Sequence, residues 1–136
     1  MGSRIRTSFL VLILGGFIFS VSAPAIGVAA AVFTGAGSGH GRDVVVARDG
    51  SVYVTGVFSG TVDFDPGPGR DARVAVDGYD VFVTRYAPDG AYLGTRTFGR
   101  AGDDESGGVE LSESGDVTLS GNGELGPFVE QFRVGE

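Results

Sequence analysis

The chain has 136 residues, a formal net charge of −7 and no cysteine. Its acidic balance excludes nucleic acid as a partner, because a phosphate backbone requires a basic face, and the lack of cysteine excludes a disulfide framework or a thiolate metal site. The 25 glycines exceed the usual share of about 7% and lie between β-branched runs, which is typical of short strands.

The first thirty residues have the pattern of an export signal. Arg4 and Arg6 precede an apolar stretch, and a tail of small residues follows it, so we expect cleavage after Ala30 or Ala25. A mature chain of residues 31–136 would carry a net charge of −9. The alternative is an uncleaved membrane anchor, since about 20 apolar residues span a bilayer. The sequence therefore predicts a secreted or cell-surface protein, which contacts a membrane only through this segment if it is uncleaved.

Residues 31–97 are predicted to form a first unit of four antiparallel strands. Runs with a period of two cover residues 44–47 and 52–55. Asp49-Gly50, a pair that tolerates positive φ, joins them into a hairpin. A third strand is predicted over residues 81–86.

A turn at Pro88-Asp89-Gly90 leads into a fourth strand, predicted over residues 91–98. The chain enters the unit through residues 31–33, which we interpret as the end of a fourth strand from a preceding unit. Four antiparallel strands in this order are the layout of a propeller blade. No stretch after residue 31 has the periodicity that predicts a helix.

Residues 98–136 repeat the first unit in a shortened form. The hairpins match at a spacing of 65 residues, with Asp49-Gly50 corresponding to Ser114-Gly115 and Val52–Gly56 to Val117–Gly121. A third strand over 127–132 lies only 46 positions after its counterpart, so the second unit lacks 19 residues from the segment 57–80. A fixed period of this kind indicates a repeat architecture, in which each unit needs stacked neighbours to bury its apolar face.

Four segments carry a resemblance to a known family: Asp49–Gly56, Phe58–Gly69 with its Phe-Asp-Pro-Gly-Pro-Gly run, Asp80–Gly90 and Thr97–Gly99. They are similar to the bacterial β-propeller repeats often called SBBP repeats. The resemblance implies an all-β fold of antiparallel four-stranded blades in an exported or surface protein, mostly without an assigned activity. Gly94 stands where the family would have tryptophan, and the chain ends inside its second blade. We therefore expect an incomplete propeller of about one and a half blades, since a closed ring needs about 4 to 8.

The apolar faces of these units lead to a prediction about association. The core positions are Val44, Val46, Val52 and Val54 in the first unit and Val109, Leu111, Val117 and Leu119 in the second. We expect each of these faces to have one neighbouring sheet instead of two. Exposed apolar faces and unpaired edges favour association, and repeat arrays need about three units for stability. The mature chain is therefore predicted to self-associate or to be only marginally folded alone.

Acidic loops are the best candidates for a binding site. Asp63 and Asp65 precede the Pro-Gly turns, and Asp103-Asp104-Glu105 lies between the two units. Asp77 and Asp80 flank Gly78 in a third acidic loop. Ca²⁺ needs several oxygens at once, and the run from Asp63 to Gly67 begins like a calcium loop but does not continue like one. We therefore expect turn formers and solvated loops, with a Ca²⁺ site as the alternative and no other cofactor.

No catalytic constellation is visible in the sequence. His40 is the only histidine, no Gly-x-Ser-x-Gly elbow is present, and Ser38 is too close in sequence to face it easily. The alternating glycines from Gly35 to Gly41 precede a strand and not a helix, so they do not form a phosphate cradle. We predict a structural or recognition module without enzymatic activity, with a protein or glycan ligand. The alternative is a fragment of an extracellular carbohydrate-active or calcium-binding propeller enzyme, with carboxylates from the acidic loops at work.

Overall fold

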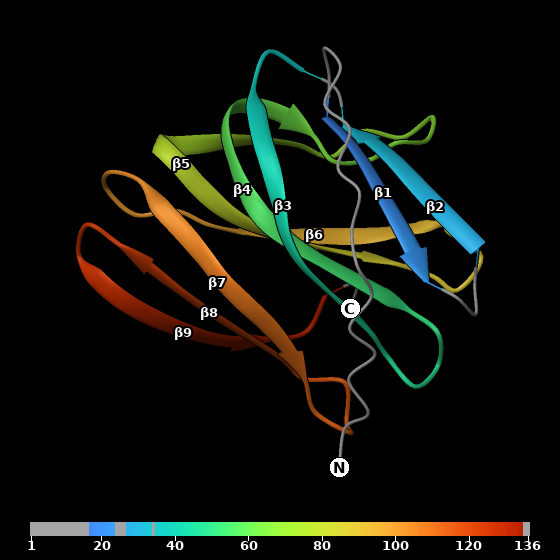
Figure 1. The fold of residues 1–136 in the computed structure, drawn as a ribbon. Coiled ribbons are helices and arrows are strands. Elements are labelled where there is room, and N and C mark those ends of the chain that lie inside the picture. Colours follow the sequence, from blue (N-terminus) through green and yellow to red (C-terminus); the bar gives the residue numbers. More distant parts are fainter. Residues whose placement is uncertain (1–16, 24–26, 34, 135–136) are drawn as a thin grey trace.

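The described part of this computed structural model, residues 17–23, 27–33 and 35–134, contains nine antiparallel strands in three sheets (Figure 1). Each sheet has its strands in sequence order. The two-stranded sheet consists of β1 (Phe17–Ala23) and β2 (Gly27–Phe33). The four-stranded sheet consists of β3 (Ser38–Val46), β4 (Val52–Asp63), β5 (Ala72–Tyr86) and β6 (Tyr92–Phe98). The three-stranded sheet consists of β7 (Asp104–Leu111), β8 (Val117–Gly123) and β9 (Gly126–Phe132). The predicted all-β antiparallel fold is confirmed.

Three hairpin turns share one pattern of hydrogen bonds. In each turn the amide of the first residue donates to the carbonyl oxygen four residues later, and a glycine amide donates back to the carbonyl oxygen of the first residue. The glycine has a φ of 86 to 89°, which other residues rarely adopt. The turns are 47–51 with Gly50, 87–91 with Gly90 and 112–116 with Gly115. The turns predicted at these positions are confirmed.

The two larger sheets carry a β-bulge at corresponding positions. The register shifts between Gly41 and Asp43 in β3, and between Ser106 and Gly108 in β7, 65 residues further along the chain. Gly56 and Gly121 lie opposite these bulges, where a Cβ atom would collide with the backbone carbonyl oxygen of His40 or of Glu105. Close backbone approach therefore requires glycine at both positions.

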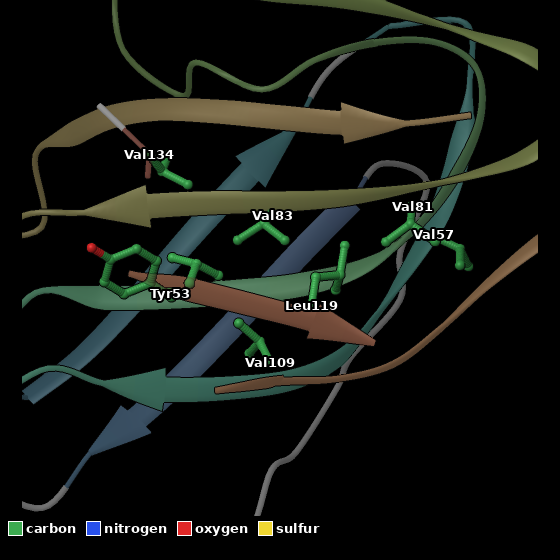
Figure 2. Close-up of a cluster of buried hydrophobic side chains, with 8 residues drawn as sticks. Tyr53, Val57, Val81, Val83, Val109, Leu119 and Val134 are labelled. Atoms are coloured by element: carbon green, nitrogen blue, oxygen red, sulfur yellow. The ribbon is translucent and has the colours of Figure 1, made fainter. Parts of the chain in front are cut away.

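The two larger sheets pack face to face and bury a shared apolar core between them, as Figure 2 shows. The four-stranded sheet contributes Tyr53, Val57, Val81 and Val83, the three-stranded sheet contributes Val109, Val117 and Leu119, and Val134 joins them after β9. Full burial of one such aliphatic side chain contributes about 1.5–3 kcal/mol. The exposed ion pair Arg48–Glu113 between the same sheets contributes at most about 1 kcal/mol. Apolar burial therefore dominates this contact.

Three polar contacts align the sheets within this interface. The buried Thr55 and Ser106 hydroxyl groups lie 2.9 Å apart and share a hydrogen bond. The Asp43 carboxylate in β3 accepts the amide of Val109 in β7 at 3.2 Å. At the end of β5, Arg85 donates to the carbonyl oxygen of Val134 at 3.0 Å. These contacts fix how the two apolar faces meet.

The other face of the four-stranded sheet is covered by an extension of its own β4–β5 hairpin. Beyond a register shift the hairpin continues as residues 61–75, which we call the flap. Phe64 in the flap is fully buried, and its ring centroid lies 5.2 Å from that of Phe58 and 5.0 Å from that of Phe82. The flap contains the whole Phe-Asp-Pro-Gly-Pro-Gly run, which the second unit lacks.

A polar network holds the flap against β6. Arg73 donates to the Asp71 carboxylate at 2.6 Å and to the Thr95 carbonyl oxygen at 3.1 Å. The Tyr92 hydroxyl donates to Asp71 at 2.6 Å. Burial acts to raise the pKa of Asp71, but the hydrogen bonds from Arg73 and Tyr92 outweigh it and hold this pKa below its ordinary value. Asp71 is therefore ionised at neutral pH and binds the flap to the edge strand.

The exposure expected for the first apolar face is not found, because the flap covers this face, whereas self-association stays a prediction. Val52 and Val54 are buried beneath the flap, with Val44 and Val46 packed against the same cluster. The three-stranded sheet has an apolar face only toward its neighbour. Its outer face presents the cross-strand rows Glu110–Thr118–Gln131 and Gly108–Ser120–Val129. Each larger sheet therefore has its apolar surfaces covered within one chain.

The hairpin of β1 and β2 falls largely in the segment predicted as a signal peptide. Residues 31–33 form a strand as expected, but they pair with residues 17–19 of β1 and not with the larger sheets. The interpretation of residues 31–33 as the end of a strand from a preceding unit stays a prediction. Removal of the segment 1–30 stays a prediction.

Substitution of either bulge-facing glycine should destabilise the protein. We expect Gly56→Ala and Gly121→Ala each to lower the free energy of unfolding by about 1–3 kcal/mol, because the added methyl group displaces backbone. Urea unfolding measures this. Gly107→Ala is the matched control, because the corresponding position in β3, Arg42, carries a side chain. A Cβ atom on Gly107 would lie 3.3 Å from its nearest neighbour, the carbonyl oxygen of Ser120. An equal loss for all three variants would contradict the close-approach explanation.

Candidate functional site

The connection between β6 and β7, residues 99–103, crosses from one sheet to the other and is held by Arg100. The Arg100 amide donates to the Asp104 carboxylate at 2.7 Å, and its guanidinium group donates to the carbonyl oxygen of Gly126 at 3.0 Å. The same guanidinium carbon lies 4.8 Å from the ring centroid of Phe128. Arg100 thus joins the connection to the β8–β9 hairpin.

Two of the predicted acidic loops meet at this end of the interface. The Asp103 carboxylate accepts the amide of Tyr79 at 3.0 Å, which brings the part of β5 around Asp77 and Asp80 against the inter-sheet connection. Asp80 and Asp104 are each only 2% exposed. Glu105 follows in β7 with an exposed side chain. The structure therefore gathers Asp80 of β5, Asp103 of the connection and Asp104 at the start of β7, so the acidic loops expected at Asp77–Asp80 and at Asp104-Glu105 are strand residues.

Asp80 has the most unusual environment of these acids. One carboxylate oxygen accepts the amide of Val76 at 2.9 Å, and the other is buried without a hydrogen-bond partner. Burial raises the pKa of Asp80, the hydrogen bond from Val76 opposes that rise, and the charges of Asp104 and Asp77 add to it. The surroundings of Asp80 thus disfavour its ionised form.

Asp63 and Asp65 lie apart from this group, in and beside the turn of the flap. Asp63 accepts the amides of Asp65 at 3.2 Å and of Asp71 at 2.9 Å. Asp65 accepts the amide of Gly67 at 2.8 Å. Aspartate usually forms turns in this way, when backbone amides a few residues along the chain donate to its side-chain carboxylate. The geometry of these hydrogen bonds therefore matches the turn-forming role that the sequence favours.

The same use of carboxylates recurs throughout the candidate residues. Asp63, Asp65, Asp103 and Asp104 each accept at least one backbone amide. Over the residues that the structure describes, no three acidic, histidine or cysteine side chains are arranged to hold a metal ion. The arrangement fits the fixing of loops, and the Ca²⁺ alternative stays a prediction.

His40 and Ser38 do not face each other as a nucleophile and base would. The Ser38 hydroxyl lies 2.9 Å from that of Ser59. The exposed His40 ring stacks beside Tyr79, with centroids 6.5 Å apart and planes inclined by 26°. This geometry is that of an edge strand packed by cross-strand contacts.

Sequence reasoning did not find the contacts of Arg100, Asp71 and Asp43. Arg100 and Asp104 have helix-like spacing inside a β protein, so nothing in their pattern indicates a pair. Asp71 depends on Tyr92, 21 residues away, and Asp43 on Val109, 66 residues away. Only the observation that Asp43 stands where the second unit has Gly108 could have pointed to a special role.

No family model, no curated protein and no solved structure matches the chain. Within the described ranges, no helix has the length and apolar character needed to cross a membrane.

Calcium should not stabilise the protein through the flap. We expect millimolar Ca²⁺ to leave the melting temperature unchanged, because Asp63 and Asp65 already accept backbone amides. Thermal unfolding with and without Ca²⁺ tests this, with Mg²⁺ as the control ion. A rise of several degrees that is lost in the Asp63→Asn, Asp65→Asn double variant would overturn the turn-forming role.

Asp80→Asn should stabilise the protein in a pH-dependent way. The folded-state pKa of Asp80 is raised above its ordinary value. Ionisation of Asp80 therefore lowers the free energy of unfolding as pH rises from the ordinary pKa through the raised one, and it has no effect at pH values below both. We expect a higher free energy of unfolding than the parent at pH 7 and almost no difference near pH 3. Urea unfolding at both pH values measures this. The variant Asp103→Asn, at an exposed aspartate, serves as the comparison. A variant that destabilises equally at both pH values would contradict it.

Proposed function

We propose that the chain is an exported module of two propeller-type repeat units that serves as a structural or recognition element and not as a catalyst. The observation that carries this proposal is the recurrence of a hairpin turn, a β-bulge and its facing glycine after 65 residues in two sheets that pack face to face. Stacked units of one design that bury a shared apolar core are the hallmark of repeat proteins.

The two units differ in completeness. The first, residues 31–97, includes β3 to β6 of the four-stranded sheet except Phe98, the last residue of β6. The second, residues 98–136, includes β7 to β9, and the short Gly123–Gly126 connection replaces the flap. In the proposed family such units are blades, and about one and a half are present here. Export through residues 1–30 to the cell surface or the medium belongs to the same proposal.

Polar and acidic surfaces support a recognition role. The outer face of the three-stranded sheet is lined by Glu110, Thr118, Ser120 and Gln131, with Val129 as its exposed apolar residue. Side chains of this kind bind protein or glycan ligands by hydrogen bonds, whereas the net negative charge disfavours nucleic acid. A glycan or protein ligand is therefore proposed, with no nucleic-acid partner.

The second candidate is a fragment of an extracellular carbohydrate-active enzyme. The observation in its favour is the pair of buried carboxylates Asp80 and Asp104, since glycoside hydrolysis uses two carboxyl groups. However, both carboxylates accept backbone amides at the inter-sheet connection. This use favours a structural role for them.

A combined glycan-binding and hydrolysis screen on the full chain tests the proposal. We expect no turnover of any polysaccharide, whether or not a glycan binds. Asp80→Asn and Asp104→Asn are the diagnostic variants, and Glu130→Gln on an exposed strand is their control. Hydrolysis that both diagnostic variants lose and the control keeps would establish the enzyme alternative.

A further inference from the structure

β5 of the four-stranded sheet and β9 of the three-stranded sheet hold the same place beside β4 and β8, their preceding strands. In the four-stranded sheet Gly56 of β4 pairs with Phe82 of β5, and in the three-stranded sheet Gly121 of β8 pairs with Phe128 of β9. β9 is therefore the counterpart of β5, 46 residues further along the chain.

The outer edges of these two counterparts differ. Residues 81–86 of β5 pair on their far side with β6, from Val81↔Phe98 to Tyr86↔Tyr92. β9 has no strand on its far side within the described part of the chain. After β9 the chain turns inward, where Val134 is buried in the inter-sheet core. The position that β6 fills in the first sheet is thus open in the second.

The chemistry of this edge follows from the β8–β9 turn. Gly123 pairs with Gly126 across a two-residue connection, and the closing pair of such a hairpin is hydrogen-bonded. Because bonded and non-bonded pairs alternate, residues 127, 129 and 131 direct their backbone groups outward. Pro127 has no amide, so the edge offers the amides of Val129 and Gln131 and the carbonyl oxygens of all three residues.

We propose that this edge pairs with β9 of a second copy of the chain, in antiparallel orientation about a two-fold axis at Val129. The proposal rests on the equivalence of the two units in the proposed function, and it names the partner of the second unit. An open edge with outward amides and carbonyl oxygens accepts an extended strand. An isologous contact needs one surface only, and it forms a closed dimer.

The register follows from charge and from the outward groups. An axis at Val129 places Val129 opposite its own copy, with Phe128 opposite Glu130 of the second copy. An axis at Glu130 would place two like charges directly opposite each other, which is destabilising in a sheet. Val129 is 66% exposed on the polar face, so its burial against its copy adds an apolar contact. The axis at Val129 is therefore favoured at neutral pH.

Cysteine cross-linking tests the contact directly, because the chain has no cysteine of its own. We expect Val129→Cys in the full chain to form a disulfide-linked dimer under mild oxidation, since directly paired residues about 5.5 Å apart at Cα suit a disulfide. Val76→Cys is the matched control, a 72% exposed valine on β5 near the flap. Equal cross-linking of the two variants would overturn the proposal.

Two further variants separate strand pairing from general association. Val129→Pro removes an outward amide that β8 does not use, and we expect it to weaken dimerisation in sedimentation velocity by at least about tenfold. Val129→Ala keeps the amide and should still dimerise. Circular dichroism confirms that both fold. Unchanged dimerisation of Val129→Pro, or a parent chain that is monomeric at all concentrations, would overturn the proposal. If the chain hydrolysed a polysaccharide and Val129→Cys still cross-linked specifically, the proposed function would be overturned and the dimer contact would stand.

Discussion

The apolar contact between the four-stranded and three-stranded sheets is the interaction on which the described structure depends. Each sheet presents one face of valine and leucine side chains that water would solvate poorly, and face-to-face packing removes both faces at once. The hydrogen bond between Thr55 and Ser106 and the contact of Asp43 with Val109 form only when the sheets have met. Polar contacts therefore select one alignment of a contact that apolar burial drives.

Much of this arrangement could be predicted from local sequence. Asp-Gly and Ser-Gly pairs mark turns because glycine adopts the positive φ at Gly50, Gly90 and Gly115. Alternation in residues 44–47 and 52–55 marks strands because successive side chains point to opposite faces. These signals act over a few residues, so they predicted the hairpins, whereas the 19 residues missing from the second unit followed from comparing the spacing of the two units.

Contacts between distant residues could not be predicted in the same way. The acidic loops were recognised, but the burial of Asp80 follows from the packing of the connection 99–103 beside it, which no local pattern encodes. Phe64 reads as part of a loop because it precedes a Pro-Gly run, whereas its ring completes the core beneath the flap. The flap was missed because a hairpin that bends back over its own sheet has the same alternation as one that extends into solvent.

The flap also determines how far this architecture can grow. It occupies the face on which a preceding unit would stack, and the polar outer face of the three-stranded sheet offers no apolar surface for a following one. A sheet placed on either outer face of the described pair would meet the flap or polar side chains, and not an apolar surface like the one between the two larger sheets. In the proposed pairing of β9 with its copy, which runs in the plane of the sheet, a two-fold contact satisfies both partners and gives a finite particle instead of a filament.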